Sequence, residues 1–389
     1  MMGDEGFGLY IHWPFCISKC PYCDFNSHVA ERVDQGAWQT ALRAELAHFA
    51  ARTPGRRLTS IFFGGGTPSL MEPATAEVLI QDARRAWTPA NDLEVTLEAN
   101  PGTVDADRFA AFRAAGIDRL SMGVQALNDA DLKFLGRKHG VEEARTAWRA
   151  ASKIFERVSF DLIYARPGQT ADAWTAELRE ALDEVDRCGI THLSLYQLTM
   201  EDGTPMAADY ARGAFRLPDE DNAASLYEIT QTLCESAGFP AYEISNHARE
   251  SAACRHNLTY WRGGDYVGVG PGAHGRVTLD GVTHATRQMK APALWLKKVE
   301  RDGAGTQEEE VLPADARAEE LVMTALRTTE GIDKTRFARL SGRDLAATVN
   351  QEALAMLVRE GLMIETPGAL QTTARGRLAL NAVVRALLA

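Results

Sequence analysis

Short apolar runs alternate with amphipathic stretches over the first two thirds of the chain, and this pattern predicts a sheet covered by helices. We predict strands at residues 9–13, 60–63, 93–98, 119–123, 158–163 and 192–196. Helical patterns fall between and after these runs, at residues 37–51, 74–87, 104–115, 128–135 with 141–152, 171–188 and 219–237. Strands and helices that alternate in this way form right-handed βαβ units, so we expect the sheet to be parallel.

Polar residues near the predicted strands favour a barrel over a doubly wound sheet, because functional groups gather at the carboxyl ends of barrel strands. The candidates at these ends are a cysteine-rich loop after the first strand, the run Gly64-Gly65-Gly66-Thr67-Pro68 after the second, Glu98 at the end of the third, Gln125 after the fourth, Asp161 inside the fifth and Gln197 at the end of the sixth. We therefore predict an α/β fold with a partial (β/α)6 barrel of the TIM type. Taken singly, a tight turn would also explain the glycines, and ordinary strand-end polarity would explain Glu98 and Gln125.

The loop Cys16-Ile-Ser-Lys-Cys20-Pro-Tyr-Cys23 places three thiols close together, which is a pattern of metal-binding sites. In a cubane iron–sulfur cluster each iron normally takes one external thiolate. Three cysteines would hold three irons and leave the fourth open to a small molecule that chelates through an amine and a carboxylate. The alternative is a structural zinc with His28 as the fourth ligand, although zinc sites usually pair two ligand knuckles and the chain has no second CxxC or HxxxH motif.

Length and charge narrow the class of protein. A chain of 389 residues exceeds what one hydrophobic core usually supports, so a large and a small domain are expected. The 42 Lys and Arg against 53 Asp and Glu give a net charge of −11, which argues against a general nucleic-acid or anionic-membrane binder. The first residues do not form a signal-peptide pattern, and no apolar run reaches membrane-spanning length. We expect a cytoplasmic protein without a transmembrane segment.

We divide the chain into a barrel domain at residues 1–300, a solvated connector at 301–313 and a small unit at 314–389. The small unit has helical patterns at 316–327, 334–340 and 345–360, short strands at 362–365 and 369–372, and a last helix at 374–388. Helices followed by a two-stranded wing resemble a winged helix. From residue 311 onward ten Lys and Arg stand against nine Asp and Glu, a poor surface for phosphates. We therefore favour a cover or partner-docking module, with DNA binding as the weaker alternative.

The segment His256-Asn257-Leu-Thr-Tyr260-Trp261 places a metal ligand beside flat aromatic faces. A planar apolar macrocycle with a central iron would suit this combination. A histidine near aromatic residues is more often structural, however, and from these residues alone the structural interpretation stays ahead.

Six distinct motifs follow one another along the chain. They are Tyr10-Ile-His12-Trp-Pro-Phe-Cys16, the CxxxCxxC loop, Phe63-Gly-Gly-Gly-Thr-Pro68, Glu98-Ala-Asn-Pro101, Ser121-Met-Gly-Val-Gln125 and Phe160-Asp-Leu-Ile-Tyr164. Together they resemble the coproporphyrinogen-oxidase-like branch of the radical S-adenosylmethionine (radical SAM) proteins. The resemblance spans nearly the whole chain, including the small unit. It implies a partial barrel, a 4Fe-4S cluster, bound S-adenosylmethionine and a low-potential electron donor such as flavodoxin or ferredoxin.

The resemblance also implies roles for individual residues. Cys16, Cys20 and Cys23 would hold the cluster. The S-adenosylmethionine site would be lined by Tyr10, Tyr22, Gly65, Gly66, Thr67, Glu98, Gln125, Arg137 and Asp161, with glycine-loop amides binding the amino-acid end of the cofactor and carboxylates binding amine or ribose hydroxyl groups. His256 would be the haem ligand, next to Asn257 and the apolar walls Tyr260 and Trp261.

Two activities of this branch compete for the chain. One is oxygen-independent coproporphyrinogen III oxidase, a radical SAM decarboxylase of haem synthesis, and the other is a haem chaperone that binds haem and transfers it to acceptor proteins. The oxidase has a long segment before its cluster loop and a further cysteine two positions after the last cluster ligand, where this chain has Phe25. The HNxxYW pattern is characteristic of the chaperone. We therefore expect the chaperone, without coproporphyrinogen oxidase activity.

Overall fold

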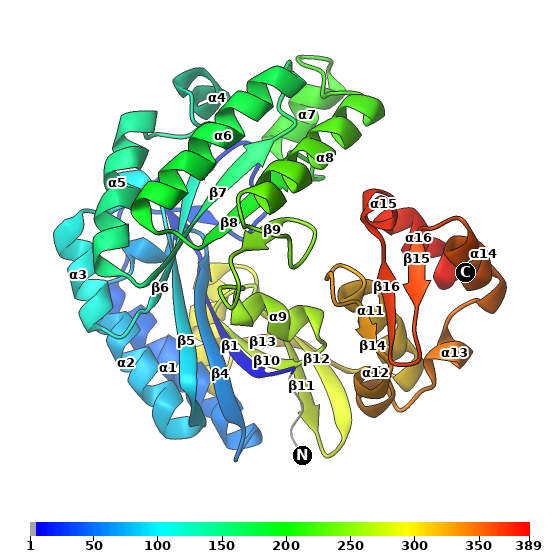
Figure 1. Ribbon diagram of the computed structural model, residues 1–389. Coiled ribbons are helices and arrows are strands. Elements are labelled where there is room, and N and C mark those ends of the chain that lie inside the picture. The colour runs from blue at the N-terminus through cyan, green and yellow to red at the C-terminus, as the bar shows by residue number, and fades with distance from the viewer. Residues whose placement is uncertain (1–4) are drawn as a thin grey trace.

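The main domain is built on one open, curved sheet (Figure 1). The computed structural model describes residues 5–389, and within them this sheet has eleven strands in the order β13-β12-β11-β10-β1-β4-β5-β6-β7-β8-β9. Its six central strands run parallel, at β1 (Phe7–Trp13), β4 (Arg57–Gly65), β5 (Thr88–Ala99), β6 (Arg119–Gln125), β7 (Arg157–Tyr164) and β8 (His192–Gln197). All six coincide with predicted strands, so the predicted parallel sheet is confirmed.

Helices cover the outer face of this sheet, and most begin at a capping side chain. Asp34, Asp105, Thr170 and Asp219 each accept a hydrogen bond from a backbone N–H of the first helical turn. The helices and 3-10 turns of the main domain are α1 (Gln35–Arg52), η1 (Pro68–Leu70), α2 (Pro73–Ala86), η2 (Pro101–Thr103), α3 (Ala106–Ala114), α4 (Asp129–Phe134), α5 (Val141–Ile154), α6 (Ala171–Cys188), α7 (Pro205–Ala211), α8 (Glu220–Ser236), α9 (Arg255–Trp261) and α10 (Pro292–Asp302). None of the helices in residues 5–389 is long and apolar enough to cross a membrane.

The core of the main domain lies between the outer helices and the sheet. Side chains of β1 such as Leu9 and Ile11 are fully buried, as are Val95 of β5 and Trp148 of α5. Strands buried on both faces are typical of parallel sheets with helical crossovers. Helix α9 differs from the others because it lies across the inner face, where it contacts β1, β4 and β10 (Figure 1).

The prediction of an irregular connector at residues 301–313 is wrong, because this segment contains a strand. Helix α10 runs to Asp302, and β13 (Thr306–Val311) forms the edge of the main sheet next to β12 (Val282–Gln288). The run Glu308-Glu-Glu310 misled the prediction, because charged residues on an edge strand face solvent and still leave the backbone free to pair. Strands β10 (Asp265–Val269) and β11 (His274–Leu279) complete this side of the sheet, and β9 (Asn246–Ala248) ends the other. The sheet therefore extends beyond the predicted barrel boundary at residue 300.

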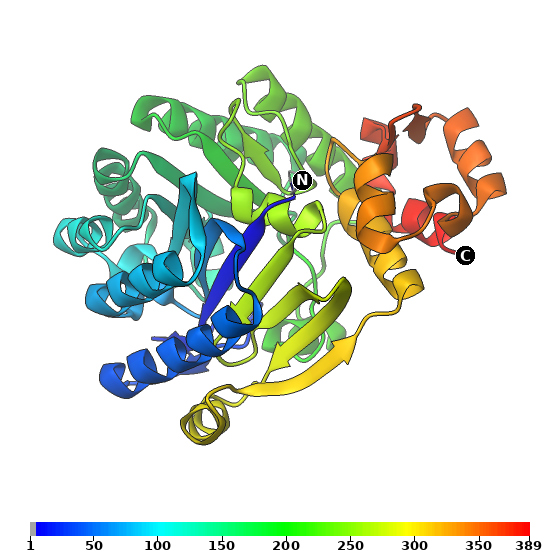
Figure 2. The same cartoon turned by 90° about the horizontal axis from the view of Figure 1, so that it is seen from below.

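The C-terminal unit packs around a core of its own and stands beside the main domain (Figure 2). Its elements are α11 (Ala314–Ala325), β14 (Ile332–Asp333), α12 (Lys334–Ser341), α13 (Leu345–Thr348), α14 (Gln351–Arg359), β15 (Met363–Glu365), β16 (Ala369–Thr372), α15 (Ala374–Leu378) and α16 (Leu380–Leu387). The two predicted strands form a wing, which β14 extends to three strands. The predicted helix at 345–360 is two helices, because the Asn350 side chain caps α14 by accepting from Ala353 N.

Candidate functional site

The cysteine loop leaves the carboxyl end of β1 and is closed by a short parallel pair, β2 (Phe15–Cys16) with β3 (His28–Val29). This pairing turns the three thiols toward the carboxyl ends of the neighbouring strands. Thr67 Oγ1 lies 3.3 Å from Cys16 Sγ, and Arg137 Nη1 lies 3.5 Å from Cys20 Sγ. At Cys16 this contact opposes the effect of burial, which raises the pKa of the thiol.

The three cysteines line a single cavity of about 140 Å³ at these strand ends. Its other walls include Tyr22, Gly65, Gly66, Thr67, Glu98, Asn100, Ser121, Gly123, Gln125, Arg137 and Asp161. Every residue predicted for the S-adenosylmethionine site lines this cavity except Tyr10, which lines the neighbouring one. The structure therefore brings residues from the cysteine loop after β1 together with residues as distant in sequence as Asp161 of β7.

The glycine run has a packing role that differs from the predicted one. Gly65 has φ +114°, and a Cβ there would lie 2.5 Å from the His12 ring, while a Cβ on Gly66 would lie 2.8 Å from the carbonyl oxygen of Phe15. The amides of this run are already bonded, since Gly65 N donates to Glu98, Gly66 N to Trp13 O and Thr67 N to Phe15 O. The predicted role of these amides in binding the ligand stays a prediction, and in this structure they bond within the chain. The glycines instead let β4 end directly against the cysteine loop.

The donor set at this cavity is three thiols, which is the set that a cubane cluster with one open iron would take. Within residues 5–389, no three His, Cys, Asp or Glu side chains converge as ligands of one ion. His28 Nε2, the predicted fourth zinc ligand, lies 3.2 Å from Asn26 Oδ1. The three thiols border one shared cavity. Gly123 also lines it, and a Cβ there would lie only 3.3 Å from Asn100 Oδ1 and 3.4 Å from Arg137 Nη2, so the missing side chain keeps this part of the cavity open.

Two buried carboxyl groups give the cavity its electrostatic character. Burial, and to a lesser extent the charge of Asp161, raise the pKa of Glu98 to about 8, against the opposing effect of the hydrogen bond from Gly65 N. Burial also raises the pKa of Asp161 to about 6, against the opposing effect of hydrogen bonds from Ser194 and Ser121. Arg137 is the nearby cation, and it also donates to the carbonyl oxygen of Gly123 at 2.7 Å. At neutral pH Glu98 is therefore mostly protonated until a positive group approaches it.

A second cavity of about 200 Å³ continues from the first, because Glu98, Ser121 and Asp161 line both. Helix α9 supplies His256, Asn257 and Tyr260 to its wall, and Tyr10 and Phe62 stack beside the His256 ring. The segment predicted to bind haem therefore lies next to the predicted cofactor site. This proximity joins residues more than 100 positions apart in the sequence.

His256 is held firmly in this wall. Its Nδ1 lies 2.8 Å from Ser60 Oγ, its Nε2 lies 2.5 Å from the Tyr260 hydroxyl, and its ring stacks on Phe62 at 5.0 Å between centroids. Burial lowers the pKa of His256 to about 3, so the ring is neutral. Both ring nitrogens are thus hydrogen-bonded, so Nε2 would have to give up its hydrogen bond with the Tyr260 hydroxyl before it could bind a metal ion.

Trp261 lies apart from the other three predicted haem residues. The guanidinium group of Arg327, just after α11 in the C-terminal unit, lies 4.9 Å from the Trp261 ring centroid. Trp261 therefore faces the C-terminal unit, while His256, Asn257 and Tyr260 face the cavity. Asn257 Nδ2 donates to the Tyr242 hydroxyl at 3.3 Å, which fixes its side chain within that wall.

Glu94 of β5 positions α9, and sequence reasoning missed it. Its carboxylate is fully buried and accepts from the backbone N–H groups of Arg255 at 2.9 Å and His256 at 3.3 Å. It also accepts from Arg157 at 3.1 Å and lies 3.6 Å from Arg119. The available signal was a carboxylate inside an apolar strand, the same signal that singled out Asp161.

Comparisons with known proteins place these observations in a family. Residues 10–185 match the radical SAM superfamily model, and residues 312–379 match the HemN C-terminal domain model. The chain is 36% identical to the heme chaperone HemW of Escherichia coli, with 98% of both chains covered, and 37% identical to that of Mycobacterium tuberculosis, with 100% of this chain and 96% of the relative covered. It is 42% identical to the mitochondrial radical S-adenosyl methionine domain-containing protein 1 of Bos taurus, over 85% of this chain and 75% of that protein.

The fold has a solved counterpart. The structure of coproporphyrinogen III oxidase (HemN) from Escherichia coli superposes with a TM-score of 0.79 over 98% of this chain and 89% of that chain. The two sequences are 23% identical, so this likeness bears on the fold alone. The near-complete coverage by HemW relatives, together with the two matched domain models, shows that this chain belongs to the HemW family of radical SAM proteins.

Proposed function

We propose that this chain binds haem and transfers it to acceptor proteins, on a radical SAM scaffold that holds a 4Fe-4S cluster and S-adenosylmethionine. The observation that carries this proposal is the wall of Glu98, Ser121 and Asp161, which joins the cavity of the three thiols to the cavity of His256 and Tyr260. The relatives named heme chaperones, which align over nearly the whole chain, support it.

In the proposed cofactor site, Cys16, Cys20 and Cys23 would each ligate one iron, and the fourth iron would take the amino and carboxyl groups of S-adenosylmethionine. Such a cluster supplies low-potential electrons when reduced. Arg137 would offset negative charge at Cys20, since its guanidinium group is already within 3.5 Å of that sulfur. Glu98 and Asp161 would face the positively charged or hydroxyl groups of the cofactor. A flavodoxin or ferredoxin as electron donor and a cytoplasmic location remain predictions.

Binding of S-adenosylmethionine should strengthen as pH rises from 6.5 to 8. The pKa of Glu98 is raised to about 8, so below that pH a proton must leave before the carboxylate can pair with a positive group. Affinity should rise by up to about tenfold per pH unit in this range. Anaerobic equilibrium dialysis of the reconstituted protein at several pH values would measure it.

The control is Glu98→Gln, which keeps the side-chain shape but cannot titrate. Its affinity should be weaker and should stay flat over the same pH range. An equally steep rise in Glu98→Gln would assign the titration to another group, and a flat wild-type profile would contradict the role of Glu98.

Haem binding should respond to His256 and to its hydrogen-bond partner in opposite directions. His256→Ala removes the proposed iron ligand, so stoichiometric binding should be lost, and transfer to acceptor proteins with it. Tyr260→Phe removes the hydroxyl that lies 2.5 Å from Nε2, which frees this nitrogen and should tighten haem binding by about twofold to tenfold. Absorbance titration under anaerobic conditions would measure both affinities.

Trp261→Ala is the matched variant outside the cavity. Its ring packs against Arg327, so it should reduce haem affinity less than His256→Ala does. Unchanged affinity and transfer in a His256→Ala/Trp261→Ala double variant would refute the assignment of the haem site to α9.

The competing activity is oxidative decarboxylation of coproporphyrinogen III, the reaction of the HemN enzyme whose fold this chain shares. Phe25 replaces the extra cysteine of the oxidase, lines the thiol cavity and is 57% exposed. Anaerobic incubation with coproporphyrinogen, S-adenosylmethionine and a reductant should give no decarboxylated product. Turnover without stable haem binding would reverse the proposal.

A further inference from the structure

The cavity proposed to hold haem is too small for this ligand in the present structure. Its volume is about 200 Å³, below the range of about 300–1,000 Å³ that is usual for small-molecule sites, and haem is a large planar ring. The adjoining cavity of about 140 Å³ is the proposed cofactor site, so it cannot supply the missing room. A wall of the haem cavity must therefore move before haem can enter.

Two walls of this cavity are attached to the C-terminal unit. One wall is α9, and just after this helix the carbonyl oxygen of Gly263 accepts a hydrogen bond from Arg317 Nη2. The other wall is the segment that leads into β9, where Thr329 N donates to the carbonyl oxygen of Tyr242 at 3.1 Å and Asn246 lines the cavity. A displacement of the C-terminal unit would therefore release both walls together.

Exposed ion pairs join the C-terminal unit to the main domain at several points. They are Glu5 with Arg339 at 2.7 Å, Arg262 with Glu330 at 2.8 Å and Arg276 with Glu320 at 2.9 Å. All six side chains are partly exposed, and ion pairs of this kind contribute little to stability. Each domain also packs around a hydrophobic core of its own. Polar contacts between domains with separate cores permit relative motion of the domains.

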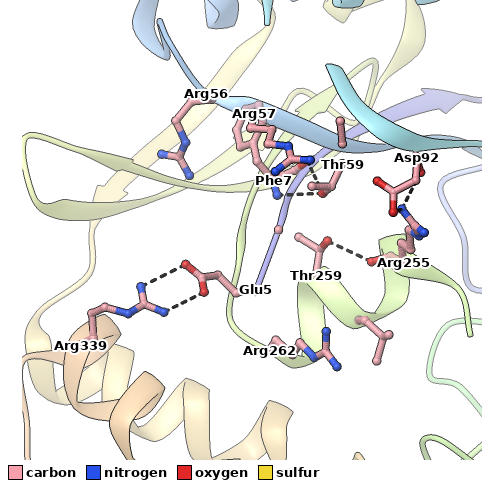
Figure 3. A pocket seen from close by; sticks show the side chains of 13 residues that line it. Glu5, Phe7, Arg56, Arg57, Thr59, Asp92, Arg255, Thr259, Arg262 and Arg339 are labelled. Atoms are coloured by element: carbon pink, nitrogen blue, oxygen red, sulfur yellow. Dashed lines mark hydrogen bonds and ion pairs between the residues drawn. The ribbon is translucent and has the colours of Figure 1, made fainter. Parts of the chain in front are cut away.

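A large pocket beside α9 gives this helix and the C-terminal unit room to move (Figure 3). The pocket has a volume of about 670 Å³ and lies where the two domains meet. Leu258 and Thr259 of α9 line it, whereas His256 lines the haem cavity. Figure 3 shows the pair of Glu5 with Arg339 joining the two domains at this pocket. Helix α9 therefore has open space beside it that lies outside the haem cavity.

We propose that the C-terminal unit is a clamp on the haem cavity, closed in this structure, which must open before haem can enter or leave. The inference rests on the proposed function, because that function supplies the ligand. Opening would break the exposed ion pairs and free the carboxyl end of α9, while Glu94 keeps the amino end of this helix on the sheet. Haem would then reach the proposed site at His256 from the side that the C-terminal unit covers.

The two halves of one ion pair give the sharpest test of this clamp. Arg276→Gln and Glu320→Gln remove the same contact between the domains but change the net charge in opposite directions. Each variant should raise both the association and the dissociation rate constant of haem by about threefold to tenfold, because both rates follow the population of the open state. Stopped-flow absorbance with the anaerobically reconstituted full-length protein would measure association. Capture of the released haem by an excess of a haem-free globin would measure dissociation.

Two controls and a second readout complete the experiment. Glu352→Gln and Arg359→Gln make the same two charge changes at exposed side chains of α14, which packs against α16 and β15 of its own unit, so both rate constants should stay at their wild-type values. Hydrogen exchange needs no haem. The N–H group of Thr329, which donates across the interface to Tyr242, should exchange faster in Arg276→Gln and in Glu320→Gln than in wild type.

The outcomes separate the clamp from the proposed function. If wild type binds haem and both rate constants are unchanged in Arg276→Gln and Glu320→Gln, the clamp fails while the proposed function stands. Faster association in Glu320→Gln with slower association in Arg276→Gln would assign the effect to the charge of haem and would likewise overturn the clamp. Absence of haem binding in wild type would overturn both.

Discussion

Replacing Cys16, Cys20 or Cys23 by serine should abolish assembly of the iron–sulfur cluster. Each thiol would ligate a different iron, and the loop offers no spare cysteine, since the next residue of this type in the chain is Cys188. Iron and acid-labile sulfide in the reconstituted protein should fall to the background of the unreconstituted protein. Binding of S-adenosylmethionine should fall with them, because its anchoring iron is gone.

Cys188→Ser is the control for this series, since Cys188 is a free, partly buried cysteine at the end of α6. It should keep full iron content and full cofactor binding. A complete cluster in Cys20→Ser, or an equal loss of iron in Cys188→Ser, would contradict the assignment of the cluster to this loop.

Glu94→Ala should destabilise the fold by about 3–5 kcal/mol, because it leaves buried arginine without its carboxylate. The Arg119 side chain is 3% exposed and lies 3.6 Å from Glu94. The same change removes the acceptor for the first two N–H groups of α9, at Arg255 and His256. Urea unfolding of the cluster-free protein would measure the free energy of unfolding.

Two variants sharpen this test. Glu94→Gln keeps an acceptor for α9 but not the negative charge, so its loss of stability should be intermediate. Glu156→Ala removes an exposed carboxylate that pairs with Arg113 at 3.5 Å, and it should leave the free energy nearly unchanged. If Glu94→Ala matched Glu156→Ala, Glu94 would not be the group that positions α9.

This link between stability and the haem site follows from where Glu94 lies. Its backbone belongs to a central strand, while its carboxylate fixes the end of the helix that carries His256 and Tyr260. Haem affinity in Glu94→Gln therefore reports on α9 and on the neighbouring Arg119, which lines the same cavity, provided that the variant remains folded. The proposed haem residues depend on the sheet as much as on their own sequence motif.

Local patterns were sufficient for the framework of the main domain. The six central strands are short apolar runs whose side chains are buried on both faces, and such runs are visible without tertiary contacts. The placement of Glu98 and Asp161 near the carboxyl ends of their strands followed from the same rule. The connector at 301–313 failed because the charges of β13 concealed a strand whose pairing partner, β12, only the fold supplies.

For the candidate site, too, the sequence determined some features and the tertiary structure determined the others. The sequence by itself determined which residues carry chemistry: three thiols at fixed spacing, the glycine run, two carboxyl groups in apolar strands and the histidine beside aromatic residues. Only the tertiary structure decided that α9 crosses the inner face, that Glu94 anchors it, that Trp261 turns away from the cavity and that the glycine amides are already bonded. The reason is physical, because residue spacing encodes local geometry, whereas burial, pKa values and hydrogen-bond partners arise from segments that packing brings together.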